Sequence, residues 1–106
     1  MENIFKGILN AIELPIVFVD CSNKITFMNK TAIEHYKDQG GENLLGKSIF
    51  CCHNENSKKL ILEGLNKLKN GLDKVLVFEN DKIKEYMLAV RDNETLLGYF
   101  EIVEKK

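Results

Sequence analysis

The sequence predicts a single α+β domain, in which helices cover one face of an antiparallel sheet. The chain has 106 residues, the usual size of one domain. The predicted elements follow the order helix, two strands, a central helical block and three strands. The links between consecutive strands are short, so these strands are expected to be antiparallel neighbours.

An amphipathic helix is predicted over residues 1 to 13, ahead of a domain at residues 14 to 106. Pro15 ends this helix, because the residue before a proline avoids helical geometry. Its apolar positions recur at helical spacing: Ile4, Phe5, Ile8, Leu9 and Ile12.

A β-hairpin is predicted next. Residues 16 to 19 (IVFV) and 25 to 28 (ITFM) are rich in β-branched and aromatic side chains, and DCSNK between them is turn material. Asn29 is then placed to cap a helix that begins at Lys30 or Thr31.

The strongest helix signal lies between residues 54 and 71. Asn54 or Asn56 is expected to cap its start, and Gly71 to end it in a left-handed conformation. Gly64 costs about 1 kcal/mol relative to alanine and leaves room for another backbone or a ligand. One helix face carries Ile61, Leu65 and Leu68. Before this helix, LLGKSIF is interpreted as a short helical turn and a tether.

Three strands complete the prediction. They are KVLVFE (residues 74 to 79), KIKEYMLAV (82 to 90) and LLGYFEIVE (96 to 104). The Asn80-Asp81 pair and the segment RDNE provide the two turns.

This ordered set of elements resembles a PAS domain. LPIVFVDCSNKITFMNKTA is similar to the opening hairpin of that family, and LAVRDNETLLGYFEIVE to its closing hairpin. LLGKSIF resembles the segment before the long helix. A narrower resemblance is to PAS domains of anaerobic bacterial and archaeal signalling proteins, which carry a Cys-His motif before the long helix. Cys51, Asn54 and Glu55 depart from that motif.

The resemblance implies a five-stranded sheet in the order 2-1-5-4-3 and a pocket beneath the helices. PAS domains sense small molecules, redox state or light, or mediate association. This implies a signal-sensing domain in signal transduction or transcription regulation, with an unidentified ligand or cofactor. The residues predicted to bind it are Phe18, Phe27, Tyr36, Phe50, His53, Leu65, Met87 and Phe100. Each also suits a hydrophobic core, which a domain of this size needs.

The adjacent residues Cys51, Cys52 and His53 suggest further possibilities. A haem could be held by His53 or by His35, and Cys52 near a helix start could be a reactive thiolate. The favoured interpretation is a turn between a tether and the long helix. No metal site is predicted, because neighbouring residues on an extended chain point to opposite sides.

Composition excludes several classes of function. The net charge is −1, which gives no reason to expect direct binding to nucleic acid or to an anionic membrane. The sequence contains no nucleophile elbow or phosphate-binding loop, so no enzymatic activity is expected. With three cysteines and no signal peptide, a cytoplasmic location is expected.

Association is the remaining prediction. The leading helix of PAS domains commonly packs on a partner subunit, so a homodimer through the N-terminal helix and the sheet is expected. The alternatives are an interaction module that binds no ligand, and a haem or thiol redox sensor around His53.

Overall fold

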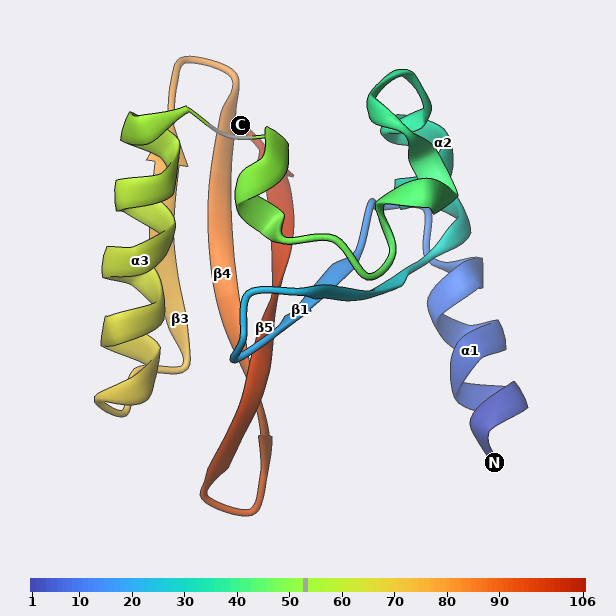
Figure 1. Cartoon of the computed structure of the whole chain (residues 1–106), viewed down its shortest axis with the longest axis horizontal. Coiled ribbons are helices and arrows are strands. Elements are labelled where there is room, and N and C mark those ends of the chain that lie inside the picture. The colour runs from blue at the N-terminus through green and yellow to red at the C-terminus, as the bar shows by residue number, and fades with distance from the viewer. Residues whose placement is uncertain (53) are drawn as a thin grey trace.

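The computed structural model describes residues 1–52 and 54–106, and its sheet has the predicted order. Five antiparallel strands run β2-β1-β5-β4-β3 across the sheet (Figure 1). The strands are β1 (Val17–Asp20), β2 (Ile25–Met28), β3 (Lys74–Glu79), β4 (Ile83–Asp92) and β5 (Thr95–Lys105). The α+β fold class and the strand order are therefore confirmed.

Helices pack on one face of this sheet. The long helix α3 lies over β3 and β4, whereas α2 and the short turns lie towards β1 and β2 (Figure 1). The helices are α1 (Glu2–Ala11), α2 (Lys30–His35) and α3 (Glu55–Lys69). The 3₁₀ turns are Lys37–Gln39, Gly41–Leu44 and Ile49–Cys52. Of the helices described, none combines the length and apolar character needed to cross a membrane.

Two asparagines start the helices as the sequence predicts. The side-chain oxygen of Asn29 accepts a hydrogen bond of 2.9 Å from the Ala32 N–H, and α2 begins at Lys30. Asn54, not Asn56, does the same for α3 by accepting from the Ser57 N–H at 2.9 Å. Each bond pairs an amide that the first helical turn would otherwise leave without a partner.

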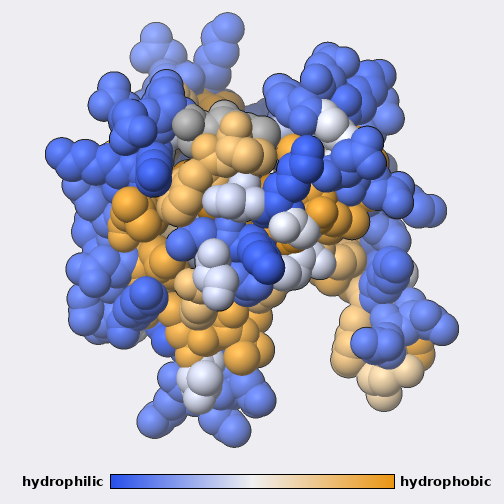
Figure 2. Space-filling model, in the orientation of Figure 1, coloured by the Kyte–Doolittle hydropathy of each residue, from blue (hydrophilic) through white to orange (hydrophobic). Residues whose placement is uncertain are grey.

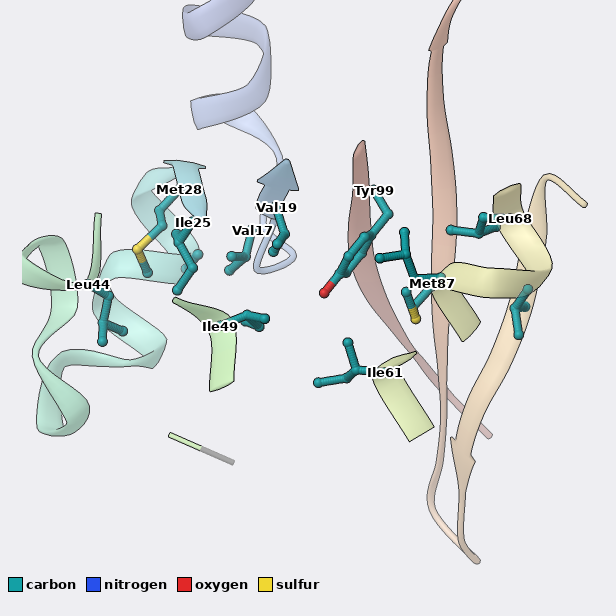
Figure 3. Close-up of a cluster of buried hydrophobic side chains, with 13 residues drawn as sticks. Val17, Val19, Ile25, Met28, Leu44, Ile49, Ile61, Leu68, Met87 and Tyr99 are labelled. Carbon is teal, nitrogen blue, oxygen red and sulfur yellow. The ribbon is translucent and has the colours of Figure 1, made fainter. Parts of the chain in front are cut away.

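The core lies between the helices and the inner face of the sheet (Figure 3). Alternation along β1 turns Val17 and Val19 inward and Phe18 outward. The buried cluster consists of Val17, Val19, Ile25, Met28, Ala32, Leu44, Ile49, Ile61, Leu65, Leu68, Val75, Met87 and Tyr99.

The outer face of the sheet is also apolar. Phe18 is paired with Phe27 on one side and with Phe100 on the other, and Phe100 is paired with Leu88. Paired residues share a face of the sheet, so these four side chains form one outer patch. All four are half-buried.

Helix α1 stands apart from the core. None of its residues is buried, and Ile4, Phe5 and Ile8 are each more than half exposed. Figure 1 shows α1 below α2 and extending away from it, and Figure 2 shows apolar atoms exposed at that end of the molecule. Its apolar face is thus available for contact with another surface.

Candidate functional site

A pocket of about 150 Å³ lies between the inner face of the sheet, α2 and the short turns. A cavity of about 150 Å³ can take benzene, whereas drug-sized ligands need roughly 300–1,000 Å³. The pocket as described is therefore of a size suited to a small molecule. Its lining consists of Val17, Ile25, Met28, Tyr36, Gln39, Leu44, Ile49, Glu85 and Glu101.

Two glutamates contribute acid groups to this mostly apolar lining. Glu85 is on β4 and Glu101 on β5. In the register Met87 pairs with Glu101 and Glu85 pairs with Val103, so the glutamates are diagonal neighbours. Because Met87 faces the core, Glu85 and Glu101 face the same way, and long side chains reach across a diagonal pair.

The surroundings of Glu101 favour its protonated form. Burial raises the pKa of Glu101 to about 8, with further contributions from the negative charge of Glu85 and from a hydrogen bond to it. At neutral pH the Glu101 carboxylic acid therefore donates a hydrogen bond to the Glu85 carboxylate. Among the described residues, no ion pair includes either glutamate.

Tyr36 places a hydroxyl group in the same pocket. It follows the last turn of α2 and is half-buried. Burial raises the pKa of Tyr36 to about 12, and the charges of Glu101 and Glu85 add to the shift. Its hydroxyl therefore stays protonated and available for hydrogen bonding near neutral pH.

Tyr99 brings a second hydroxyl towards this region. The residue is completely buried, and its hydroxyl has no hydrogen-bond partner among the described residues. Figure 3 shows the oxygen pointing from β5 towards Val17 and Ile49, two residues of the pocket lining. Burial raises the pKa of Tyr99, and the charge of Glu101 raises it further. An unpaired buried hydroxyl costs about 1–3 kcal/mol, so a partner here would be stabilising.

A smaller pocket of about 80 Å³ adjoins the same glutamates on the α3 side. The acid pair therefore lies between two hollows of the interior. The residues lining the smaller pocket are Ser57, Leu60, Ile61, Val77, Phe78, Glu85 and Glu101.

The predicted ligand-binding residues fall in several places. Tyr36 lines the larger pocket, whereas Leu65 and Met87 are buried in the core away from its lining. Phe50, on the 3₁₀ turn Ile49–Cys52, packs against the core, and its ring centroid lies 5.2 Å from the Lys58 Nζ. His53 is outside the described residues.

Three predicted aromatic residues are on the outer face of the sheet. Phe18, Phe27 and Phe100 share that face through their strand pairing, and none lines the pocket. Side chains of this face point away from the helices. Of the predicted residues that the structure describes, Tyr36 alone lines the pocket.

Sequence reasoning missed Glu85 and Glu101. One signal was available: Met87 was expected to face the interior, so alternation turns Glu85, two residues earlier, to the same side. A charged residue in an inward position of a strand indicates a special environment. The position of Glu101 beside Glu85 results from the pairing of β4 with β5, and no local sequence pattern indicates it.

The other cysteine and histidine residues are dispersed. Cys21 and Cys51 are exposed, and the His35 ring lies edge-on to Tyr36 with 4.7 Å between centroids. His35 lines neither pocket. Among the side chains that the structure describes, which leave out those of residues 52 and 53, no three from His, Cys, Asp or Glu are grouped to hold a metal ion.

The sequence matches no protein-family model and no curated protein. Solved structures do match. A C-terminal domain from Streptococcus mutans is 23% identical, with a TM-score of 0.78 over 98% of this chain and 84% of that chain. A PAS domain from Colwellia psychrerythraea is 15% identical, with a TM-score of 0.70 over 99% of this chain and 96% of that one.

A third match is the PAS domain of the histidine kinase ThkA. It is 17% identical, and the TM-score is 0.63 over 88% of this chain and 99% of that chain. The narrower resemblance to PAS domains with a Cys-His motif stays a prediction. From the strand order and these matches together, the chain has the fold of a PAS domain.

Proposed function

We propose that this domain is a signal sensor that binds a small molecule in the larger pocket and has no catalytic role. The observation that carries the proposal is that several polar side chains converge on an otherwise apolar cavity. Glu85, Glu101 and Tyr36 line it, and the unpaired hydroxyl of Tyr99 points towards it. Apolar walls with a few convergent polar groups are typical of ligand sites.

The fold supports a sensory role. Similar solved structures include PAS domains, one of them from a histidine kinase. In such a role the domain would pass its state to an effector or partner. That step is a proposal for this chain, since the structural likeness concerns the fold.

The pocket is placed where occupancy would alter packing. Val17 and Ile25 belong to the first hairpin, Leu44 to the turns after α2, and Glu101 to the central strand β5. A ligand touching all of these would favour one arrangement of the helices over the sheet. Such a shift requires different affinities for the two arrangements.

The test is native mass spectrometry of the freshly purified full chain, followed by ligand titration. We expect a retained small molecule that is lost on denaturation. Leu44→Phe, which fills the pocket, should abolish retention, whereas Leu45→Phe at the exposed neighbouring position should not. Circular dichroism would confirm that both variants fold. Equal retention by both folded variants would contradict the proposal.

A second candidate function is homodimerisation, by which the domain would act as an interaction module. It is favoured by the exposed apolar face of α1 and by the outer patch of Phe18, Phe27, Leu88 and Phe100. Exposed apolar surfaces of this kind mark association sites. We propose that α1 and the outer face of the sheet meet those of a second copy.

A further inference from the structure

We propose that the ligand of the larger pocket is a small organic cation, an ammonium or amidinium group on a short apolar body, held by Glu85 and Glu101. This inference rests on the proposed sensor function and specifies the ligand's charge. It is not implied by the fold, because it depends on two residues of this chain.

The two glutamates at the pocket have no cationic partner among the described residues. Glu85 and Glu101 face the core from adjacent strands, and neither forms an ion pair with a described residue. No lysine, arginine or histidine is among the described residues that line either pocket. Both glutamates are half-buried, and carboxylates withdrawn from water are costly without a cationic partner. A bound cation would supply that partner.

Tyr99 is an independent indication of a polar ligand. Its hydroxyl is buried and unpaired among the described residues, and it points towards Val17 and Ile49 at the pocket. Tyr36 offers a second phenol from the end of α2. An ammonium group has three N–H donors, which matches acceptors from two carboxylates and one hydroxyl.

The apolar walls of the pocket determine the size of the ligand and the character of its hydrocarbon part. Its apolar walls are suited to a branched hydrocarbon of about six non-hydrogen atoms, given that about 150 Å³ takes benzene. An anionic ligand would be repelled by the Glu85 charge. The apolar lining is Val17, Ile25, Met28, Leu44 and Ile49.

Binding would release one proton. In the free protein burial raises the pKa of Glu101 to about 8, so its carboxyl group holds a proton near pH 7. When a protonated amine binds, Glu101 ionises to pair with it, and that proton passes to solvent. Among the described residues, the other polar groups at the two pockets are Tyr36, Gln39 and Ser57, with the Tyr99 hydroxyl directed towards the larger one, and these stay neutral near pH 7. Affinity for an amine must therefore rise with pH.

Three ligands of matched shape test this proposal: isopentylamine, isopentanol and 3-methylbutanoate. Each would be titrated into the full chain at pH 8.5 and 6.5 by calorimetry and by chemical-shift changes. We expect the amine to bind at least tenfold more tightly than the alcohol at pH 8.5. Its affinity should fall at least tenfold at pH 6.5, because one displaced proton changes affinity up to tenfold per pH unit. Calorimetry in different buffers should show close to one proton released at pH 6.5 and clearly less at pH 8.5, where Glu101 is already largely ionised.

Substitution of each glutamate tests whether Glu85 and Glu101 are responsible for amine binding. Glu101→Gln and Glu85→Gln should each weaken amine binding at least tenfold. Glu101→Gln should also remove the pH dependence, whereas Glu85→Gln leaves Glu101 free to titrate because burial is the main cause of its raised pKa. Glu104→Gln is the matched control on the same strand, because Glu104 is exposed and pairs with Lys74. Chemical-shift dispersion would show which variants are folded, and either folded glutamine variant suffices for the test.

The outcomes separate this inference from the proposed function. Equal binding of alcohol and amine would overturn the cation proposal and leave a ligand-binding pocket. A pH dependence that persists unchanged in Glu101→Gln would also overturn it. Failure of all three probes to bind would overturn the cation proposal, while retention of another molecule in native mass spectrometry would still support a sensor.

Discussion

The Asn29 side-chain amide donates a hydrogen bond of 2.9 Å to the backbone carbonyl of Leu9, so the residue that caps α2 also holds the end of α1. The same amide donates to the Leu14 carbonyl at 2.9 Å, while its oxygen accepts from the Ile16 N–H at 3.0 Å. Asn29 is completely buried. One side chain therefore joins the leading helix, the first strand and the second helix.

Replacing Asn29 by alanine should lower the free energy of unfolding by about 2–4 kcal/mol. The change removes a helix cap and leaves buried backbone groups, such as the Ile16 N–H, without a partner. Asn54→Ala is the matched control, since Asn54 caps α3 at an exposed position and should cost only about 1 kcal/mol. Urea unfolding measures both. Equal losses would show that the bonds from Asn29 to Leu9 and Leu14 contribute little.

Gly64→Ala should also destabilise the domain, although alanine is the better helix former. An added Cβ at Gly64 would lie 2.5 Å from the Met87 sulfur and 3.1 Å from a Val77 methyl carbon. The gain in helix propensity is about 1 kcal/mol, whereas overpacking costs about 1–3 kcal/mol. We expect a net loss of up to about 2 kcal/mol in urea unfolding. Gly7→Ala in α1, where the added atom meets nothing within 4 Å, should cause no loss.

Gly98→Ala should prevent stable folding. The added Cβ would overlap the backbone carbonyl of Val19 and lie 2.9 Å from the Cα of Asp20. Both atoms belong to the paired strand β1, so the clash can be relieved only by separating β1 from β5. We expect a loss of more than about 3 kcal/mol. The control is Gly46→Ala, which has a φ of 86° but open space, and should cost only about 1–2 kcal/mol. Thermal melts of both variants give the comparison.

The stability of the domain should fall as pH rises from about 4.5 to 8. The pKa of Glu101 is raised from 4.5 to about 8 in the folded state, so in this window the folded state holds a proton that the unfolded state has released. Greater proton binding by the folded state makes stability decrease with pH. The contribution from Glu101 amounts to as much as about 4 kcal/mol between pH 5 and 8.

Urea unfolding at pH 5, 6.5 and 8 would measure this dependence. Glu101→Gln should reduce the slope of stability against pH, because glutamine does not titrate. Glu104→Gln should retain the slope. If all three proteins show the same slope, the protonation of Glu101 does not contribute to stability.

Dimerisation should depend on the exposed face of α1. The double change Ile4→Asp with Ile8→Asp places charges on that face and should shift the protein from dimer to monomer in sedimentation velocity. Lys6→Ala in the same helix is the control and should remain dimeric. These substitutions are preferable to removing residues 1 to 13, because removal also breaks the bond from Asn29 to Leu9. An unsubstituted protein that is monomeric at high concentration would contradict the dimer.

Local chemistry allowed much of the fold to be predicted. The caps at Asn29 and Asn54 and the strand at residues 25 to 28 are as expected from the sequence. Gly71 follows α3 with a φ of 110°, as a left-handed stop requires. These features depend on residues close together in the chain, so their physical causes are visible in a short window.

The sequence by itself thus determined the elements, their order and the antiparallel pairing of neighbours. Only the tertiary structure decided which side of each strand faces the helices, and so placed Phe18 and Phe100 outside and Glu85 and Glu101 inside. A shift of one residue in register exchanges the two faces of a strand, and register is set by contacts between distant segments. The acid pair exists because β4 and β5 align in one particular way, which no local pattern specifies.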